Sequence, residues 1–453
     1  MRSEPTLRFL PLSDGKTPLF MWAMTPLFKI FSDPLFAGRL LSVASGFVTL
    51  LGVFALSRKL FNLKVALWSA LIYAIVPYTV FFDRMALVDS MLSAFTIWSL
   101  FLAVWLVRQP RLDLAMILGY FLGGALLVKT PAMFNILVLP LSILATSFKV
   151  ARKSLGKIFI FWIIAIVIAG VCYNLLRLGP GFTQLSARNA DYIFSPVDLV
   201  SRPLDPFIPH LRDIADWFPK LLTWPVLLFW VSGLIWVIRS RVRPGWIILI
   251  WALVPLLVQT ALLKTFTARY LLFSIPPLLI LAGFGVEKTL EKINLKNLIK
   301  TIIMVLIISS WPIYFDYLLL TNPASAPLPK AERKGYFEEW TAGYGLKDIA
   351  DFLVEKKKAG PVVVGTEGSF GTLPDGLMIY LDKAQISVIG GTATVSAKLR
   401  EAALDNQTFF VANTSRVGSN LEGAEVIKIY PKAAPIDRSY QDAVVLYKVL
   451  PIK

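Results

Sequence analysis

The sequence predicts a polytopic α-helical membrane protein that ends in a small α/β domain. The chain has 453 residues, of which 56% are hydrophobic and only 17% charged, and its mean hydropathy is +0.65. A soluble domain carries roughly 25% charged residues, so this composition excludes a soluble globular enzyme and a disordered protein. About ten stretches approach the roughly 20 apolar residues that a membrane-spanning helix needs.

The apolar stretches are separated by Pro, Gly and charged residues, which are typical of turns. They comprise residues 36–57, 64–82, 86–107, 112–128, 131–147, 157–177, 221–239, 245–263, 269–286 and 299–320. The segment 13–31 precedes them, and its part from Thr17 to Phe31 is amphipathic and too short to span comfortably. This part predicts an interfacial helix that lies on the outer surface of the membrane.

The net charge of +17 is concentrated in the apolar part of the chain. Residues 1–320 hold 30 basic and 14 acidic residues, whereas residues 321–453 hold 16 and 15. This distribution favours a membrane protein with cationic loops over a nucleic-acid binder. A single cysteine, Cys172, excludes an intrachain disulfide and argues against redox chemistry.

Loop charge predicts the orientation. Sixteen lysines and arginines lie in alternate short loops, against four in the loops between them. The first set is Arg58, Lys59, Lys64, Arg108, Arg111, Lys149, Arg152, Lys153, Lys157, Arg239, Arg241, Arg243, Lys288, Lys292, Lys296 and Lys300, and the second is Arg84, Lys129, Lys264 and Arg269. Because basic loops remain in the cytoplasm, we expect a plasma-membrane protein with residues 1–35, the large loop 178–220 and residues 321–453 outside.

Residues 321–453 read as an extracytoplasmic α/β domain. Residues 345–358 are predicted to form an amphipathic helix and residues 394–404 a second one. Five short β-rich runs predict strands, at 361–366, 385–390, 408–413, 424–430 and 442–450. Residues 1–320 form the expected transmembrane domain.

Charges gather where the spans meet the outer surface. Asp89 lies about one turn into span 86–107, where a buried charge is costly and a functional role is expected. A carboxylate favoured by the helix dipole is the alternative. Arg84 lies five residues earlier and is placed to pair with Asp89 or with an anionic ligand.

Five cations mark outer membrane ends: Lys16, Arg84, Lys129, Lys264 and Arg269. Snorkelling to lipid headgroups explains any one of them. Their clustering on the side that should be poor in positive charge favours binding of a lipid phosphate or diphosphate.

The outer loop 178–220 is polar, aromatic and far longer than the others, and long ordered loops are usually functional. Arg188, Asn189, Asp191 and Tyr192 are its candidates for contact with a sugar or an acceptor. His210 is the only histidine, so the chain offers no multi-histidine metal site.

Several motifs together resemble GT-C fold glycosyltransferases of the dolichyl-phosphate-mannose-protein mannosyltransferase and aminoarabinose transferase-like family. They are the SDGKTPLFMW block at 13–22, Ala37–Leu40, RMALVDSML, GGALLVKTPA and RYLLFSIPPLLILAG, in that order. The resemblance covers roughly residues 10–290 and implies transfer of a sugar from a polyprenyl-phosphate carrier at the outer face.

The resemblance also implies roles for residues. Lys16 matches a lysine that contacts the carrier phosphate, Asp89 an important acidic residue, and Arg269 with Tyr270 an Arg-Tyr pair near the donor cavity. The family's principal catalytic aspartate follows its first transmembrane helix. Since neither feature precedes Met1, we expect the chain to be a fragment without that helix, and Asp14 is the nearest substitute for the lost carboxylate.

The expected activity is that of a hexosyl or pentosyl transferase whose acceptor is a protein, lipid or glycan. No nucleotide or flavin cofactor is expected, and a divalent metal has little support. The alternatives are a transporter or flippase of lipid-linked sugars, which would place charges at mid-membrane, and a truncated, non-catalytic membrane protein.

Overall fold

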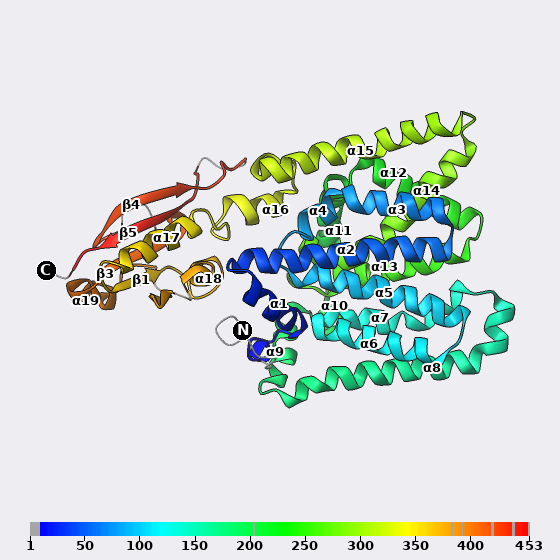
Figure 1. Ribbon diagram of the computed structural model, residues 1–453, viewed down its shortest axis with the longest axis horizontal. Helices are drawn as coiled ribbons and strands as arrows, with labels where there is room; N and C mark the ends of the chain where they lie inside the picture. Colours follow the sequence, from blue (N-terminus) through cyan, green and yellow to red (C-terminus); the bar gives the residue numbers. More distant parts are fainter. Residues whose placement is uncertain are drawn as a thin grey trace. The chain divides into compact units, whose positions relative to one another are not determined.

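The computed structural model divides the chain into two compact units, Met1–Pro327 and Leu328–Lys453 (Figure 1). It describes residues 10–202, 204–381, 384–391, 393–417, 421–436 and 440–451. The first unit is helical and the second contains a β-sheet.

The first unit is a bundle of long apolar helices. Its long members are α2 (Pro34–Leu60), α5 (Val88–Arg108), α8 (Phe148–Asn174), α13 (Arg243–Leu262), α14 (Ile275–Lys292) and α15 (Asn297–Thr321). Among the described residues, six helical stretches are long and apolar enough to cross a membrane. A seventh is formed if α11 (Phe207–Leu221) and α12 (Trp224–Arg239), which are bent by 112°, count as one span. The multi-span character is therefore confirmed, whereas the expected number of about ten is not.

Several expected spans are short or interrupted. The short apolar helices are α3 (Leu63–Ile75) and α6 (Leu112–Val128). The span expected at 64–82 breaks at Val76, because Pro77 disfavours helical backbone in the residue before it, and continues as α4 (Pro77–Phe82).

The stretch 131–147 is not one helix. It forms the 3₁₀ turn η2 (Thr130–Ala132), the short helix α7 (Met133–Leu137) and the 3₁₀ segment η3 (Leu139–Ala145). Pro131 and Pro140 explain this difference, because proline lacks the N–H that a continuous helix requires.

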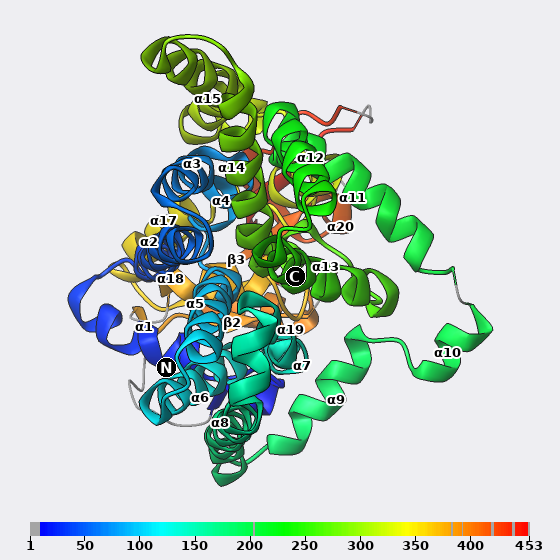
Figure 2. The same ribbon diagram turned by 90° about the vertical axis from the view of Figure 1, so that its right-hand side faces the viewer.

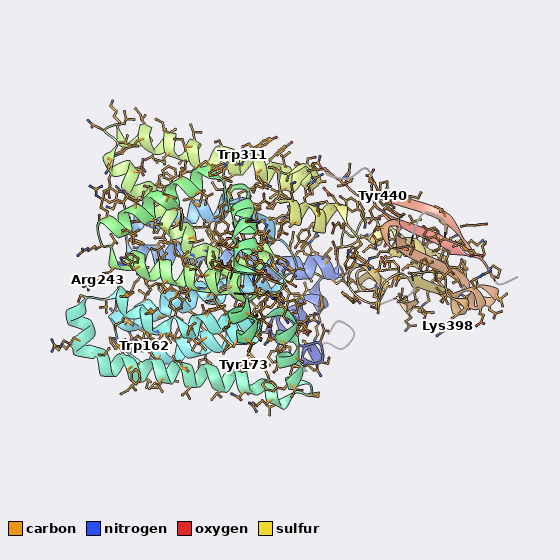
Figure 3. The ribbon with its side chains drawn as sticks, turned by 180° about the vertical axis from the view of Figure 1, so that it is seen from behind. Trp162, Tyr173, Arg243, Trp311, Lys398 and Tyr440 are labelled. Atoms are coloured by element: carbon orange, nitrogen blue, oxygen red, sulfur yellow. The ribbon has the colours of Figure 1, made fainter. Side chains whose placement is uncertain are left out.

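The interfacial helix is confirmed as a helix, α1 (Leu19–Ile30), which follows the 3₁₀ turn η1 (Leu10–Asp14). The long loop contains η4 (Leu175–Leu178), α9 (Phe182–Tyr192) and α10 (Pro196–Ser201) before α11. Figure 2 shows α9, α10 and α11 running along one side of the unit. Figure 3 shows Arg243, from one of the basic loops, at one end of the bundle, and Tyr173 towards the other.

Helices α12 and α14 pack backbone against backbone. A Cβ atom on Gly285 would lie 1.9 Å from the carbonyl oxygen of Phe229, and one on Gly233 would lie 2.2 Å from that of Leu281. Small residues permit such close approach between membrane helices, where packing and not solvent exclusion drives association. The 3₁₀ segment η5 (Ala268–Ser274) leads directly into α14.

The second unit is an α/β domain with one five-stranded sheet of order β2-β1-β3-β5-β4. Its strands are β1 (Val362–Thr366), β2 (Ser387–Ile389), β3 (Gln407–Asn413), β4 (Ala424–Pro431) and β5 (Ala443–Val449). Strands β2, β1 and β3 are parallel, while β5 is antiparallel to β3 and β4. All five predicted strands are confirmed, because each combines β-branched or aromatic residues with flanking turns.

Helices cover both faces of this sheet. Helices α17 (Leu346–Lys357) and α18 (Leu377–Leu381) pack on one face and α19 (Ala397–Asp405) on the other. The unit also contains α16 (Lys330–Arg333), α20 (Thr414–Val417) and the π-helical turns η7 (Lys334–Glu338) and η8 (Thr372–Gly376). The 3₁₀ turn η6 (Pro323–Ser325) belongs to the first unit. Ile349 and Leu353 of α17 pack with Val364 in one core, and Leu399 of α19 packs with Phe410 in the other. The two predicted helices, α17 and α19, are therefore confirmed.

Candidate donor-phosphate site

The centre of the candidate site is a buried ion pair between two helix ends. Lys129 follows the last residue of α6, and Asp89 lies in the first turn of α5. Lys129 Nζ donates to Asp89 Oδ1 at 2.6 Å, and the two side chains are 26% and 5% exposed. Because both charges are largely removed from water, each depends on the other for compensation.

An aromatic ring lies between this lysine and a second cation. Lys129 Nζ is 4.4 Å from the centre of the Tyr270 ring, and the Arg269 guanidinium is 5.2 Å from the same ring. Arg269 and Tyr270 both belong to η5. Tyr78 Oη anchors this segment by donating to the carbonyl oxygen of Ala268 at 2.5 Å. Two cations around one tyrosine form a suitable anion-binding arrangement.

The segment before α1 joins the same site. Thr17 Oγ1 donates to the carbonyl oxygen of Val128 at 2.6 Å, which places Lys16 beside the end of α6 that carries Lys129. Lys16 forms an ion pair with Asp14, and their side chains are 53% and 62% exposed. Thr17, the residue after Lys16, therefore contacts the residue before Lys129, and the side chains of Lys16 and Asp14 are both accessible.

A glycine allows the long outer loop to approach this segment. Gly15 has φ +64°, and a Cβ atom on it would lie 2.4 Å from Arg188 Cβ. Arg188 and Tyr192 lie one turn apart on α9, where Arg188 Nη2 donates to Tyr192 Oη at 3.1 Å. Asn189 is half-buried and Asp191 exposed on the same helix.

Arg84 and Lys264 have other neighbours. Arg84, in the turn after α4, interacts electrostatically with Asp316 of α15 and with Arg39. The expected pairing of Arg84 with Asp89 is therefore replaced by the pair of Asp89 with Lys129. Lys264 Nζ donates to the carbonyl oxygen of Ala190 at 2.9 Å and so holds the outer loop.

Two carboxylates were missed by the sequence reasoning, which placed only Asp89 clearly inside an apolar stretch. Asp83 is 9% exposed, and its Oδ2 accepts from Tyr73 Oη at 2.7 Å. The absence of a side chain at Gly46 of α2 makes room for it, since a Cβ atom there would lie 2.7 Å from Asp83 Oδ2. Asp316 in α15 also has a buried oxygen, Oδ1. The sequence signal was a carboxylate adjoining apolar residues: Phe82 before Asp83, and Phe315 before Asp316.

Within the described part of the chain, no group of three or more His, Cys, Asp or Glu side chains is arranged to hold a metal ion. A divalent metal is accordingly not supported by these residues.

Comparison with known structures identifies the fold. The structure of ArnT from Cupriavidus metallidurans bound to undecaprenyl phosphate superposes with a TM-score of 0.56 at 14% identity, covering 95% of this chain and 88% of that one. The structure of the same protein in the apo state gives a TM-score of 0.54 at 15% identity, covering 95% of this chain and 87% of that one. The chain therefore shares the fold of ArnT.

The Archaeoglobus fulgidus oligosaccharyltransferase tethered with an acceptor peptide gives a TM-score of 0.52 at 11% identity, covering 89% of this chain and 62% of that one. No curated protein sequence gives a significant match. Residues 15–176 match the model of the dolichyl-phosphate-mannose-protein mannosyltransferase family. This region includes Lys16, Asp89 and Lys129 but not Arg269 or Tyr270.

Proposed function

We propose that the protein transfers a sugar, hexose or pentose, from a polyprenyl-phosphate carrier to a protein, lipid or glycan at the outer face of the plasma membrane. The observation that carries this proposal is the arrangement of Lys129 and Arg269 at the ring of Tyr270. Lys16 is proposed as a third cation for the phosphate, because its neighbour Thr17 bonds to the end of α6. ArnT has been solved with undecaprenyl phosphate bound, which supports a lipid donor of this class. On this proposal, Lys264 and Arg84 bind the outer part of the carrier headgroup.

In the proposed reaction the acceptor hydroxyl attacks the anomeric carbon, and the bond from that carbon to the phosphate oxygen breaks with inversion. The cations stabilise the negative charge that develops on the departing phosphate. A carboxylate takes the proton of the hydroxyl. Asp89 and Asp14 are the proposed catalytic bases, and Asp89 also positions Lys129 through their ion pair.

The acceptor is proposed to approach from α9. Arg188, Asn189, Asp191 and Tyr192 offer both donors and acceptors of hydrogen bonds there. The contact of Gly15 with Arg188 links this helix to the segment that carries Lys16, so acceptor and donor contacts share one stretch of chain.

A lipid-linked sugar transporter is the second candidate. The interrupted segment of η2, α7 and η3 favours it, as does Asp316, which has one buried carboxylate oxygen. Transporters use broken helices and charges within the membrane. The two functions differ in chemistry, because only the transferase breaks the bond between sugar and phosphate.

Donor consumption tests the proposal. The full chain is reconstituted in nanodiscs and incubated with a panel of undecaprenyl-phosphate-linked hexoses and pentoses plus acceptor extracts of the cell envelope. We expect release of undecaprenyl phosphate, and its loss in Lys16→Ala and in Asp89→Asn. Lys330→Ala, in the second unit, is the matched control for loss of one lysine. Intact donor with every sugar, or full turnover by both variants, would refute the proposal.

The predicted sidedness has its own test. Cys172 is the only cysteine, so a Cys172→Ser background accepts single cysteines at chosen positions. A membrane-impermeant maleimide should label Lys16→Cys and Lys398→Cys in intact cells but not Arg241→Cys. Labelling of Arg241→Cys alone would place the candidate site in the cytoplasm and contradict the orientation.

A further inference from the structure

The second unit contains a cavity that the proposed transfer reaction does not use. The cavity measures 260 Å³, near the lower end of the roughly 300–1,000 Å³ typical of small-molecule sites. Its lining comes from the end of η7, from α20 and from the segment between β4 and β5, namely Glu338, Glu339, Trp340, Ser415, Arg416, Pro435, Tyr440 and Asp442. All of these residues lie in one compact unit.

The position of the cavity in the fold is one where α/β domains bind ligands. Strand β3 ends at Asn413, and α20 with Ser415 follows immediately. Asp442 precedes β5, which is antiparallel to β3, so it lies at the same edge of the sheet. Ligands of open α/β sheets bind outside the carboxyl ends of parallel strands, where neighbouring connections diverge. Here β1 and β3 are parallel neighbours, and the chain leaves β1 towards β2 on the other side.

A buried lysine makes this edge rigid. Lys432 Nζ donates to Asp442 Oδ2 at 2.8 Å and to the carbonyl oxygen of Glu339 at 2.9 Å, and it also contacts Asn413 Oδ1. Asp442 Oδ1 accepts from Ser415 N at 2.9 Å, and Oδ2 accepts from Ser415 Oγ at 3.0 Å. These bonds connect three sides of the cavity and hold its polar groups in place.

The charges around the cavity cancel. Glu338 Oε1 pairs with Arg333 Nε at 2.6 Å, and Asp442 pairs with Lys432. The remaining two charges on the lining are Glu339 and Arg416, which have opposite signs. The lining and its two ion-pair partners, Arg333 and Lys432, thus hold three carboxylates and three cations, which favours neither a free cation nor a free anion.

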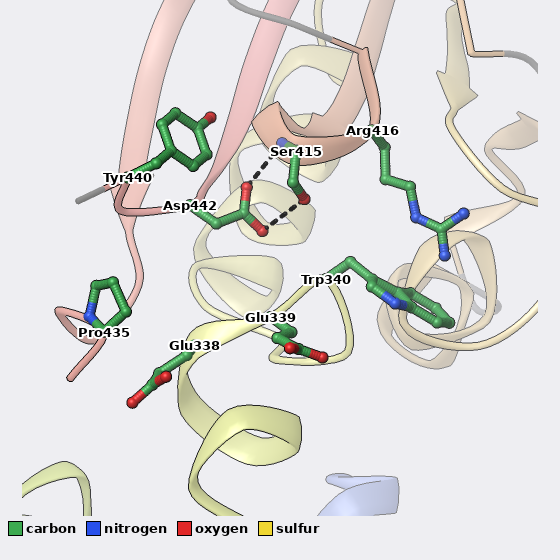
Figure 4. Close-up of a pocket in the computed structure, with 8 residues that line it drawn as sticks. All are labelled: Glu338, Glu339, Trp340, Ser415, Arg416, Pro435, Tyr440 and Asp442. Atoms are coloured by element: carbon green, nitrogen blue, oxygen red, sulfur yellow. Dashed lines mark hydrogen bonds between the residues drawn. The ribbon is translucent and has the colours of Figure 1, made fainter. Parts of the chain in front are cut away.

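Polar groups face the cavity from two opposite sides, and ring groups lie at both of its ends. Figure 4 shows Ser415 and Asp442 across from Glu338 and Glu339. Trp340 and Arg416 lie at one end, with the guanidinium 4.1 Å from the centre of the indole, and Pro435 and Tyr440 lie at the other. Such a site combines flat ring surfaces with fixed hydrogen-bond donors and acceptors.

We infer that this cavity binds one unit of a neutral saccharide. A pyranose has a C–H face that packs on an indole ring and hydroxyl groups that donate and accept at once, so it suits a lining with carboxylates, a guanidinium and hydroxyls. A charged ligand would add a charge that the ion pairs of the lining do not balance. A wholly apolar ligand would cover the polar groups of the lining without offering them hydrogen bonds. The inference concerns the second unit alone and does not depend on the transfer reaction.

Binding of small sugars to the full chain tests this inference. Nanodiscs replace detergent, because glucoside and maltoside detergents would compete. Saturation-transfer NMR and calorimetry compare the methyl glycosides of mannose, glucose and galactose with glucosamine and glucuronate, which carry opposite charges. We expect at least one neutral glycoside to bind about tenfold more tightly than both charged sugars, a ratio equivalent to about 1.4 kcal/mol.

Substitutions locate the binding. Trp340→Ala and Glu339→Gln should each weaken it about tenfold, and Glu339→Gln decides the matter if Trp340→Ala fails to fold. Phe370→Ala is the matched aromatic control, because Phe370 is 71% exposed and lies outside the lining. Lys16→Ala should leave saccharide binding unchanged, which separates this site from the proposed donor site. Three results would overturn the inference: no binding of any neutral glycoside, binding by both cavity variants as tight as that by the wild-type protein, or tighter binding of a charged sugar.

Discussion

Removal of the Lys129 ammonium should destabilise the transmembrane unit as well as abolish donor binding. In Lys129→Met the Asp89 carboxylate, whose side chain is 5% exposed, loses its partner at 2.6 Å. Breaking a buried pair in this way costs about 3–5 kcal/mol. Because the Lys129 side chain retains 26% exposure, water compensates part of the loss, and we expect a cost near the lower limit, about 3 kcal/mol.

The double variant Lys129→Met/Asp89→Leu separates stability from function. Replacing both charges with apolar groups of similar size is often neutral for stability, so the double variant should recover most of the loss. Donor binding should not recover, because the cation that faces Tyr270 is still missing. The assays are thermal unfolding in nanodiscs and binding of undecaprenyl phosphate by native mass spectrometry.

Two results would contradict this reasoning. If Lys129→Met unfolded like the wild-type protein, the ion pair would not be the buried, interdependent contact described above. If the double variant bound undecaprenyl phosphate normally, Lys129 would have no role in holding the phosphate. Lys220→Met is the matched control, because its ion pair with Asp216 is more exposed, at 36% and 39%.

Three further perturbations test other contacts. Thr17→Val removes the hydrogen bond to the Val128 carbonyl, and we expect a loss of about 1 kcal/mol in unfolding free energy together with weaker undecaprenyl phosphate binding. Gly285→Ala would place Cβ 1.9 Å from the Phe229 carbonyl oxygen, so the folded yield, measured by size-exclusion chromatography, should fall sharply. Burial alone would raise the pKa of Asp442, but hydrogen bonds to its carboxylate outweigh burial and hold that pKa below its ordinary value of 3.8. The stabilisation is therefore present above about pH 4 and is lost as pH falls through the lowered pKa, so the stability difference between wild type and Asp442→Asn should shrink below pH 4 in acid titrations followed by circular dichroism.

The secondary structure of the second unit followed closely from its sequence. Strands such as 408–413 combine aromatic and β-branched residues between turns, and the helix at 345–358 has a clear apolar face. These signals are local, so one sequence suffices to read them. The membrane unit differs, because apolar content predicts burial in lipid but does not separate a continuous helix from a broken one. Pro131 and Pro140 were the available signal, and hydropathy outweighed them.

The candidate site was predicted residue by residue but not as a set of contacts. Asp89 and Lys129 were both singled out, yet their pairing joins residues 40 positions apart, which no local pattern encodes. Asp83 was missed for the same reason, since its burial depends on Gly46 in a different helix.

The glycine contact between α12 and α14 limits how the bundle can deform. With no side chains to rearrange between Gly233 and Gly285, the two helices can neither slide nor separate without breaking their closest contact. They will therefore move together as a single rigid body. If the donor is a lipid of the proposed class, we expect its isoprenoid tail to enter elsewhere, next to helices such as α8 and α15, whose apolar windows are only 28% buried.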